Sequence, residues 1–232
     1  MNHPQFREGM KAATPIVLGY LPVGLAFGVL ARGAGISPLE VGLMSLLVYA
    51  GASQFVAVEM ISKGMVWFPI VLTTFFLNLR HLLMSSTLSL FFNKVPLRIV
   101  TLLSAQLTDE SFALAMADPS KIASRPRYVL GLQMISQCAW VAGTVIGAFF
   151  GGLINQEGYG LPFALPSLLI CLLVLQIKSS IHLGMMMFAG VLSLLFRWAF
   201  PGNWYIVLTA GVTGCAGTVI EMLRKRRPTK GG

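Results

Sequence analysis

Charged residues are scarce in this sequence. Only 11% of the 232 residues are Asp, Glu, Lys or Arg, while 56% are hydrophobic and the mean hydropathy is +0.77. A soluble domain carries roughly 25% charged residues, so the composition excludes a soluble globular domain. It also argues against nucleic-acid binding in spite of the net charge of +9. Apolar runs of about 20 residues, enough to cross a hydrocarbon core about 30 Å thick, recur along the chain. The sequence therefore predicts an integral membrane protein.

Metal ligands and enzyme motifs are also sparse. Each of the three cysteines lies in an apolar run without metal-ligand spacing, and the three histidines are scattered (Cys138, Cys171, Cys215; His3, His81, His182). The sequence contains no Walker loop, nucleophile elbow, dinucleotide fingerprint or zinc-binding histidine pair. We therefore expect no metal site, no cofactor and no enzymatic activity.

The apolar runs define the predicted fold class. They form seven to eight hydrophobic segments, which must be helical because backbone groups in lipid have to hydrogen-bond within their own segment. The sequence predicts an all-α, polytopic integral membrane protein with one transmembrane transporter domain over residues 1–232. The segments lie at roughly 12–31, 41–61, 65–92, 99–117, 128–153, 161–177, 179–197 and 203–222.

Three segments are interrupted near their centres, by "LGYLPVG" (18–24), "YAGASQF" (49–55) and "AQLTDES" (105–111). Non-helical backbone at membrane depth is tolerated only inside protein or around a polar cavity, and interrupted segments often mark a transporter's binding site. Gly and Pro are also frequent in membrane helices, which explains one such segment more easily than three. We therefore expect broken or re-entrant segments around a cavity. Glycines spaced by four residues (24, 28; 143, 147, 151) favour close helix packing.

Basic residues give part of the orientation. Because Lys and Arg beside spans stay preferentially cytoplasmic, we expect the basic loop 118–127 and the basic carboxyl terminus inside. For the amino-terminal half, two topologies agree equally well with this rule. If all eight segments cross, 4 of the 16 Lys and Arg other than Arg80 lie outside, and the same number lies outside if residues 99–117 turn back. The side of the amino terminus, and hence seven or eight spans, stays open.

An arginine and a histidine lie within the third run, in "FFLNLRHLLMSS" (75–86). Asn78 and His81 belong to a polar stripe with Thr74 and Ser85 at helical spacing. Arg80 falls about 20 Å along its helix, still inside the bilayer. Snorkelling to an interface and exit from the bilayer are alternatives, although apolar residues resume at once.

Two acids, Asp109 and Glu110, lie within the fourth run. A charge at the bilayer centre costs at least about 2.5–3.5 kcal/mol, so it normally has a partner or a task. The free-energy cost of burying these charges is lowest if Arg80 forms an ion pair with one of the two carboxylates. This pairing leaves the second carboxylate and His81 able to take up a proton, as a proton-coupled carrier requires. A purely structural ion pair beside a protonated bystander is the alternative.

The same region contains predicted helix caps. Thr108 is placed to cap a half-helix, and Ser53 and Gln54 are placed similarly. Free N–H groups at such a terminus suit a substrate carboxylate, and Asp109 or Glu110 suits an ammonium group. With the surrounding apolar residues, these groups fit a branched-chain amino acid, although other small amphiphiles would fit as well.

At these residues the chain resembles the AzlC family, the large subunits of two-component branched-chain amino-acid exporters. The similar stretches lie within residues 14–117: "LGYLPVGLAFG", "SPLEVGLMSLLVYAGASQF", "NLRHLLMS" and "LTDESFALA". The resemblance implies export from the bacterial cytoplasm, a place in the cytoplasmic membrane and a small AzlD-type partner subunit with four membrane helices. The site residues to which it points are Tyr49, Gly51, Ala52, Ser53, Gln54, Arg80, His81, Thr108, Asp109 and Glu110.

The predicted function is therefore that of a secondary carrier. It would export branched-chain or other hydrophobic amino acids by proton antiport, with substrate contacts that also include Asn78. A passive channel is one alternative, but it would need a continuous polar lining, whereas the polar stripes here are short. A non-transporting membrane assembly protein is the other, and it would leave the intramembrane charges unexplained.

Overall fold

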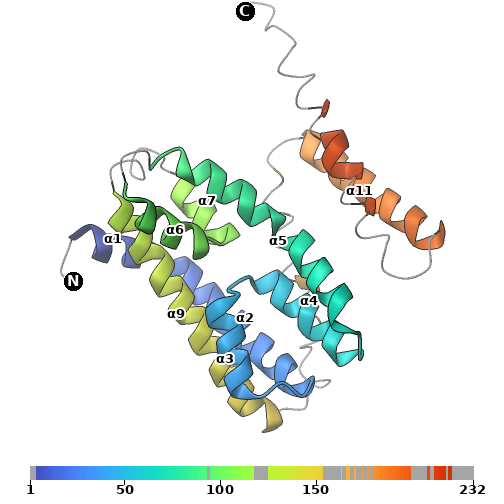
Figure 1. Cartoon of the computed structure of the whole chain (residues 1–232), viewed down its shortest axis with the longest axis horizontal. Helices are drawn as coiled ribbons and strands as arrows, with labels where there is room; N and C mark the ends of the chain where they lie inside the picture. Colours follow the sequence, from blue (N-terminus) through green and yellow to red (C-terminus); the bar gives the residue numbers. More distant parts are fainter. Residues whose placement is uncertain are drawn as a thin grey trace, which may run out of the picture. The chain divides into compact units, whose positions relative to one another are not determined.

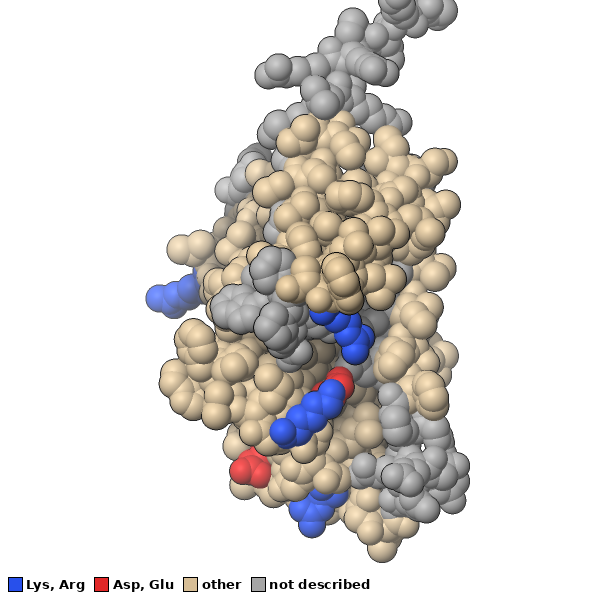
Figure 2. All heavy atoms as spheres, turned by 90° about the vertical axis from the view of Figure 1, so that its right-hand side faces the viewer, with Lys and Arg blue, Asp and Glu red and all other residues tan. Residues whose placement is uncertain are grey.

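The described part of the chain is helical. The computed structural model describes residues 4–92, 95–117, 125–153 and 180–199, together with residues 163, 166–167, 170, 174, 177, 208–209, 212–217 and 219–220. The described residues contain no strand, which confirms the all-α class. Four helices within them are long and apolar enough to cross a membrane: Thr14–Gly33, Trp67–Ser89, Pro126–Leu153 and Ser180–Ala199. On the face drawn in Figure 2, Lys, Arg, Asp and Glu cover little of the described surface.

The chain forms two compact units, Met1–Leu169 and Ile170–Gly232. A single domain over residues 1–232 therefore stays a prediction. The second unit contains α11 (Ser180–Ala199), close to the predicted segment 179–197, while the segments 161–177 and 203–222 lie largely outside the described residues. The helices of the first unit (Figure 1) are α1 (Pro4–Ala12), α2 (Thr14–Gly33), α3 (Pro38–Leu47), α4 (Gly51–Ser62), α5 (Trp67–Ser89), α6 (Leu97–Ala105), α7 (Asp109–Met116), α9 (Pro126–Phe150) and the short 3₁₀ helix η1 (Gly151–Leu153).

Helices α2 and α9 lie side by side and run in the same direction. Close contacts pair Leu25 with Gly147 and, further along both helices, Arg32 with Gly151. A Cβ atom at Gly28 would collide with the backbone of Thr144, so the repeated glycines allow the two backbones to approach. Because the helices are parallel, α2 and α9 begin on the same side of the membrane.

Helix α2 is continuous through Pro22, so the expected interruption in "LGYLPVG" is wrong. Proline removes one backbone donor, which leaves the carbonyl of Leu18 without its helical hydrogen bond. Membrane helices tolerate such a loss when neighbours support them, and here α9 lies along the whole of α2.

Residues before the first predicted segment form a further helix, α1, which continues along α9. A Cβ at Gly9 would collide with the backbone of Tyr128, and one at Gly131 with that of Phe6. At the same end, Arg125 Nη1 lies 2.9 Å from Glu8 Oε2. The amino terminus and the start of α9 therefore lie on one side, here called the α1 side.

Helices α3 and α4 form a re-entrant hairpin. Gly42 in α3 contacts Val145 in α9, and further along α3 the carbonyl of Leu46 accepts a hydrogen bond from Gln137 at 3.0 Å. Helix α3 is therefore antiparallel to α9. The chain turns at residues 48–50, and α4 returns: its Phe55 ring lies 5.1 Å from Phe27 in the second half of α2. With 10 and 12 residues, the two arms are about 15 and 18 Å long, too short to cross about 30 Å.

Helices α6 and α7 form a second hairpin from the opposite side. Gln133 in α9 contacts Leu103 in α6, and Gln137, further along α9, contacts Gln106, the residue just after α6. Helix α6 is therefore parallel to α9. After the turn at 106–108, α7 leads back toward the α1 side (Figure 1). Both hairpin tips therefore meet beside Gln137, which lies eleven residues after Pro126 and thirteen before Phe150.

Helix α5 crosses between the hairpins in the direction opposite to α2 and α9 (Figure 1). Among the described residues 4–153, three helical stretches are therefore long and apolar enough to cross a membrane: α2, α5, and α9 with η1. Both counts of basic residues above assume that residues 41–61 cross as one segment. In the structure this stretch is divided between α3 and α4, and neither helix is long enough to cross alone. The segment is apolar along its length, and its contacts with α9 are what show that it is folded as a hairpin.

Candidate functional site at the hairpin tips

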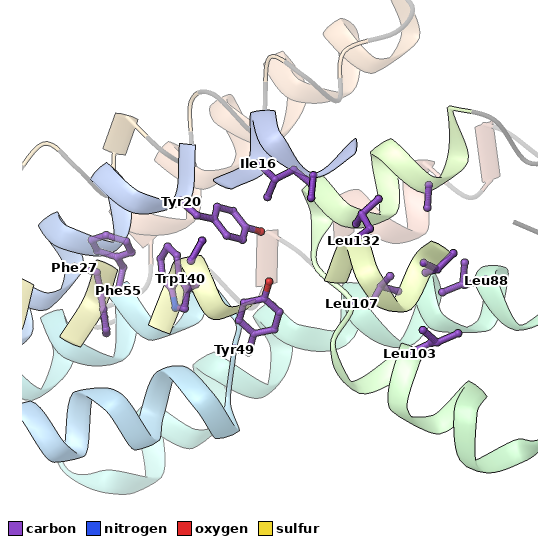
Figure 3. Close-up of a cluster of buried hydrophobic side chains, with 14 of the residues drawn as sticks. Ile16, Tyr20, Phe27, Tyr49, Phe55, Leu88, Leu103, Leu107, Leu132 and Trp140 are labelled. Atoms are coloured by element: carbon purple, nitrogen blue, oxygen red, sulfur yellow. The ribbon is translucent and has the colours of Figure 1, made fainter. Parts of the chain in front are cut away.

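The tip of the first hairpin is strained and carries a buried hydroxyl. Tyr49 has φ = 42°, in the left-handed region that residues with a side chain rarely adopt. Its side chain is only 4% exposed, and its hydroxyl has no hydrogen-bond partner among the described residues. Figure 3 shows the hydroxyls of Tyr49 and Tyr20 pointing toward the same space. A buried donor without a partner is costly, so this space suits a ligand with an acceptor.

The tip of the second hairpin begins α7 with a full capping box. Thr108 Oγ1 accepts from the backbone N–H of Ser111 at 3.3 Å, and the Ser111 hydroxyl accepts from the backbone N–H of Thr108 at 2.9 Å. The cap that the sequence predicts at Thr108 is thus confirmed. It holds the first turn of α7, and with it Asp109 and Glu110, against α2 and α5.

Arg80 in α5 and Asp109 in α7 form an ion pair, with Nη1 and Oδ2 2.7 Å apart. Their side chains are 29% and 19% exposed, so the pair is largely withdrawn from the surface. The Nε atom of Arg80 is buried without a partner among the described residues. His81 is half-buried, with Arg80 and Glu110 as its charged neighbours.

Among the described residues, Glu110 is held by a hydroxyl and forms no ion pair with Lys or Arg. Tyr20 Oη in α2 lies 2.6 Å from Glu110 Oε2 and 2.8 Å from Thr108 Oγ1. The Tyr20 ring packs edge-on against Trp140 with the centroids 5.4 Å apart, which fixes its position. We call Tyr20, Tyr49, Arg80, Thr108, Asp109 and Glu110 the tip cluster. The tip cluster thus contains two acids, Asp109 and Glu110, and one basic residue, Arg80.

The other predicted residues lie beside the tip cluster with mainly supporting contacts. The expectation that Ser53 and Gln54 cap a half-helix is wrong, because both lie inside α4, whose N-cap residue is Ala50 and has no side-chain cap. Ser53 Oγ is 3.0 Å from Asn78 Oδ1 and 2.9 Å from the carbonyl of Ala50, so it ties α4 to α5. Gln54 contacts Ser45 at 3.3 Å and accepts from the Trp140 indole at 3.0 Å. Both ends of its buried amide are used inside the protein, which leaves Gln54 little capacity for a substrate. Gly51 lies under the Trp140 ring, and Ala52 is buried.

Two residues of this region were absent from the predicted site, Tyr20 and Gln137. Tyr20 lies inside the "LGYLPVG" stretch, and Gln137 is a lone amide in the middle of an apolar span. A polar side chain at such depth was the available signal for both. Among the described residues, no three His, Cys, Asp or Glu side chains gather as ligands for a metal ion.

Comparison with known proteins identifies the family. The family described as "AzlC protein" matches residues 15–154, which span α2 through η1 and more than half of the chain. The chain belongs to the AzlC family. This confirms the resemblance. No solved structure matches the chain.

Relatives from bacteria and an archaeon are similar over most of their length. An uncharacterized membrane protein of Archaeoglobus fulgidus is 36% identical over 83% of this chain and 84% of its own. The inner membrane protein YgaZ of Escherichia coli K12 is 34% identical over 96% and 93%. The branched-chain amino acid transport protein AzlC of Bacillus subtilis 168 is 26% identical over 87% and 80%. The chain is thus a membrane protein of an amino-acid transport family.

In this member of the AzlC family, the residues matched by the family contain both hairpins. The stretches "YAGASQF" and "LTDESFALA" form the two tips and the helices that follow them, and "NLRHLLMS" supplies Arg80 between them. The three stretches, up to 60 residues apart in the chain, therefore meet at one place in the fold.

Proposed function

We propose that this AzlC-family protein exports branched-chain or other hydrophobic amino acids in exchange for protons. The observation that carries the proposal is the unequal state of two adjacent acids at mid-depth. Asp109 pairs with Arg80, whereas the partner of Glu110 among the described residues is the Tyr20 hydroxyl. A carboxylate without a cation can bind an ammonium group or a proton, so the two ligands compete for it. Such competition produces antiport.

The surroundings of Glu110 suit the remainder of an amino acid. The Tyr49 hydroxyl can donate to a carboxylate, and the uncapped amino terminus of α4 presents backbone donors at the same tip. Apolar side chains near the tips, among them Leu107, Phe55 and Trp140, are buried and suit a hydrophobic side chain (Figure 3). The name of the Bacillus subtilis relative supports a branched-chain substrate.

The orientation follows from the parallel packing of α2 and α9. Five described Lys and Arg residues flank the α1 side (Arg7, Lys11, Arg98, Arg125 and Arg127), against two on the other side (Arg32 and Lys63). Because cationic flanks stay in the cytoplasm, the α1 side is cytoplasmic. The α6–α7 hairpin then enters from the cytoplasm, and the α3–α4 hairpin enters from outside. In bacteria with two membranes, the protein lies in the inner membrane.

The proposed mechanism also includes a small membrane partner of the AzlD type. Three crossing helices surround two half-depth hairpins, and the exposed face of the short helix α3 is apolar (Leu39, Leu43, Leu46 and Leu47). A partner that covers such helices would seal the polar tips from lipid. Full export by this chain alone in liposomes would refute the requirement.

Counterflow in proteoliposomes tests the proposal. Vesicles with the chain and its partner are loaded with unlabelled leucine, and the uptake of labelled leucine is measured. We expect transient accumulation above equilibrium, which a passive channel cannot produce, and a substrate-dependent proton movement in the opposite direction. Equal equilibration with and without internal leucine would contradict a carrier.

A further inference from the structure

One side chain of α9 is bonded to both hairpin tips. Gln137 Oε1 accepts from Gln106 Nε2 at 2.7 Å, and Gln137 Nε2 donates to the Leu46 carbonyl at 3.0 Å. A backbone carbonyl can only accept, so the amide nitrogen of Gln137 must face Leu46 and its oxygen must face Gln106. The chain of bonds therefore has one consistent direction, from Gln106 through Gln137 to Leu46.

These bonds lie where each hairpin would otherwise be unsatisfied. Leu46 is in the last turn of α3 and Leu103 in the last turn of α6, where carbonyls have no partner within their helix. Gln137 supplies a donor to the first carbonyl, and Gln133, one turn earlier on α9, supplies a donor to the second at 2.9 Å. The first arm of each hairpin thus ends on a glutamine of α9.

The hairpins enter from opposite sides, so releasing one tip uncovers the cluster toward one side only. The α3–α4 tip supplies Tyr49 and the α6–α7 tip supplies Thr108, and both side chains are buried, at 4% and 6% exposed, where the two hairpins meet. From this geometry we infer that Gln137 is a positioning residue, a latch common to two gates. Breaking its bond to Leu46 opens the α3–α4 gate, and breaking its bond to Gln106 opens the α6–α7 gate.

The inference rests on the proposed transport function, because a carrier must expose one site to each side in turn. It adds which hairpin opens toward which side and which residue holds both closed. The glutamine amide suits this role because its donor and acceptor can be lost separately. A single shared residue also links the two gates, since movement of Gln137 toward one tip lengthens its bond to the other.

Cysteine labelling tests the latch without any transported substrate. The full chain is expressed with Cys138, Cys171 and Cys215 replaced by serine, and carries either Ala50→Cys at the first tip or Leu107→Cys at the second. Both positions are 3% exposed, so labelling by a membrane-impermeant maleimide should be slow in the parent chain. Right-side-out and inside-out vesicles give the side of access.

Two variants release one tip each. Gln137→Glu keeps an acceptor for Gln106 and removes the donor to Leu46, so it should speed labelling at Ala50→Cys at least about five-fold, only from the side opposite α1. Gln106→Leu should do the same at Leu107→Cys, only from the α1 side. Ser136→Ala is the matched control, because Ser136 is buried on α9 and the one partner of its hydroxyl among the described residues is Leu132 of its own helix. It should change neither rate.

Further variants keep the test decisive. Gln137→Met has a similar volume and loses both hydrogen bonds. Labelling should then be faster at Ala50→Cys from the side opposite α1 and at Leu107→Cys from the α1 side. If the Gln137 variants do not fold, the Gln106→Leu arm decides alone. Rates equal to those of Ser136→Ala, or exposure of both probes from the same side, would overturn the latch. Labelling as expected in a chain that shows no counterflow would keep the latch and refute the proposed function.

Discussion

The hydroxyl of Tyr20 lies 2.6 Å from the carboxylate of Glu110, a residue 90 positions later in the chain. The contact joins the first crossing helix to the tip of the second hairpin. It also distinguishes Glu110 from its neighbour Asp109, which pairs with Arg80. Two consecutive acids thus have different partners from different helices, and this difference underlies the proposed division between a structural acid and a coupling acid.

Replacement of Tyr20 by phenylalanine isolates this contact. The ring would remain against Trp140, while the hydrogen bonds to Glu110 and Thr108 would be lost. A hydrogen bond to a charged group is worth about 1.5–3 kcal/mol, so we expect a lower melting temperature and weakened transport. Tyr128→Phe is the control, since no hydrogen bond of the Tyr128 hydroxyl occurs among the described residues. Equal melting temperatures of the two variants would contradict a role for the Tyr20 hydroxyl.

The ion pair predicts which double substitution restores stability. Arg80→Ala leaves Asp109 as an unpaired charge, and because both side chains retain some exposure we expect a loss of about 2 kcal/mol, below the range for fully buried pairs. Arg80→Ala with Asp109→Asn should recover most of it. Arg80→Ala with Glu110→Gln should recover none. Thermal unfolding and purified yield of the four proteins measure this, and equal recovery by both acids would reject the specific pair.

The parallel packing of α2 and α9 makes a prediction about single methyl groups. A Cβ at Gly147 would collide with the backbone of Leu25, which cannot yield without moving a helix, whereas a Cβ at Gly19 meets nothing within 4 Å. Overpacking of this kind costs about 1–3 kcal/mol. We expect Gly147→Ala to lower the melting temperature and Gly19→Ala to leave it unchanged or raise it. A similar effect at both positions would argue against the close approach of α2 and α9.

The helical membrane fold was predictable because composition and run length determine it. Low charge and repeated apolar runs require lipid, and a backbone in lipid must be helical. The breaks at 48–50 and 106–108 were also predictable, since glycine, polar and charged residues accumulate there. Glycines spaced by four indicated close packing, although not which helices meet.

Other features depend on contacts between distant residues. Residues 41–61 are apolar enough to cross, and only the path of α3 along α9 shows that they turn back. Pro22 is tolerated because α9 supports α2, which local propensity does not describe. Tyr20 and Gln137 gain their roles from partners 90 and 31 residues away, so a polar side chain at such depth could mark them as unusual but not show what they contact.

The last prediction concerns the coupling acid. Arg80 stays charged at any physiological pH, so it cannot carry a proton through a cycle, and Asp109 is occupied by Arg80. Glu110 is then the acid that exchanges ammonium for a proton. We expect Glu110→Gln, which keeps an oxygen to accept from Tyr20, to abolish leucine export driven by a pH gradient while leaving the protein yield near normal. Substrate flux and proton movement are followed together in vesicles under an imposed gradient.

Two controls make this result specific to Glu110. Glu59→Gln removes an acid of the same type at an exposed position, where Glu59 pairs with Lys63 four residues later, and should leave both signals intact. Asp109→Asn should lower stability through the unpaired Arg80. In the fraction that folds, it should retain proton movement coupled to flux, because Glu110 is still present. If Glu110→Gln keeps gradient-driven flux and proton movement while Asp109→Asn loses both, the roles of the two acids are reversed. If neither variant loses them, the protons bind elsewhere, and the antiport mechanism proposed for the tip cluster is wrong.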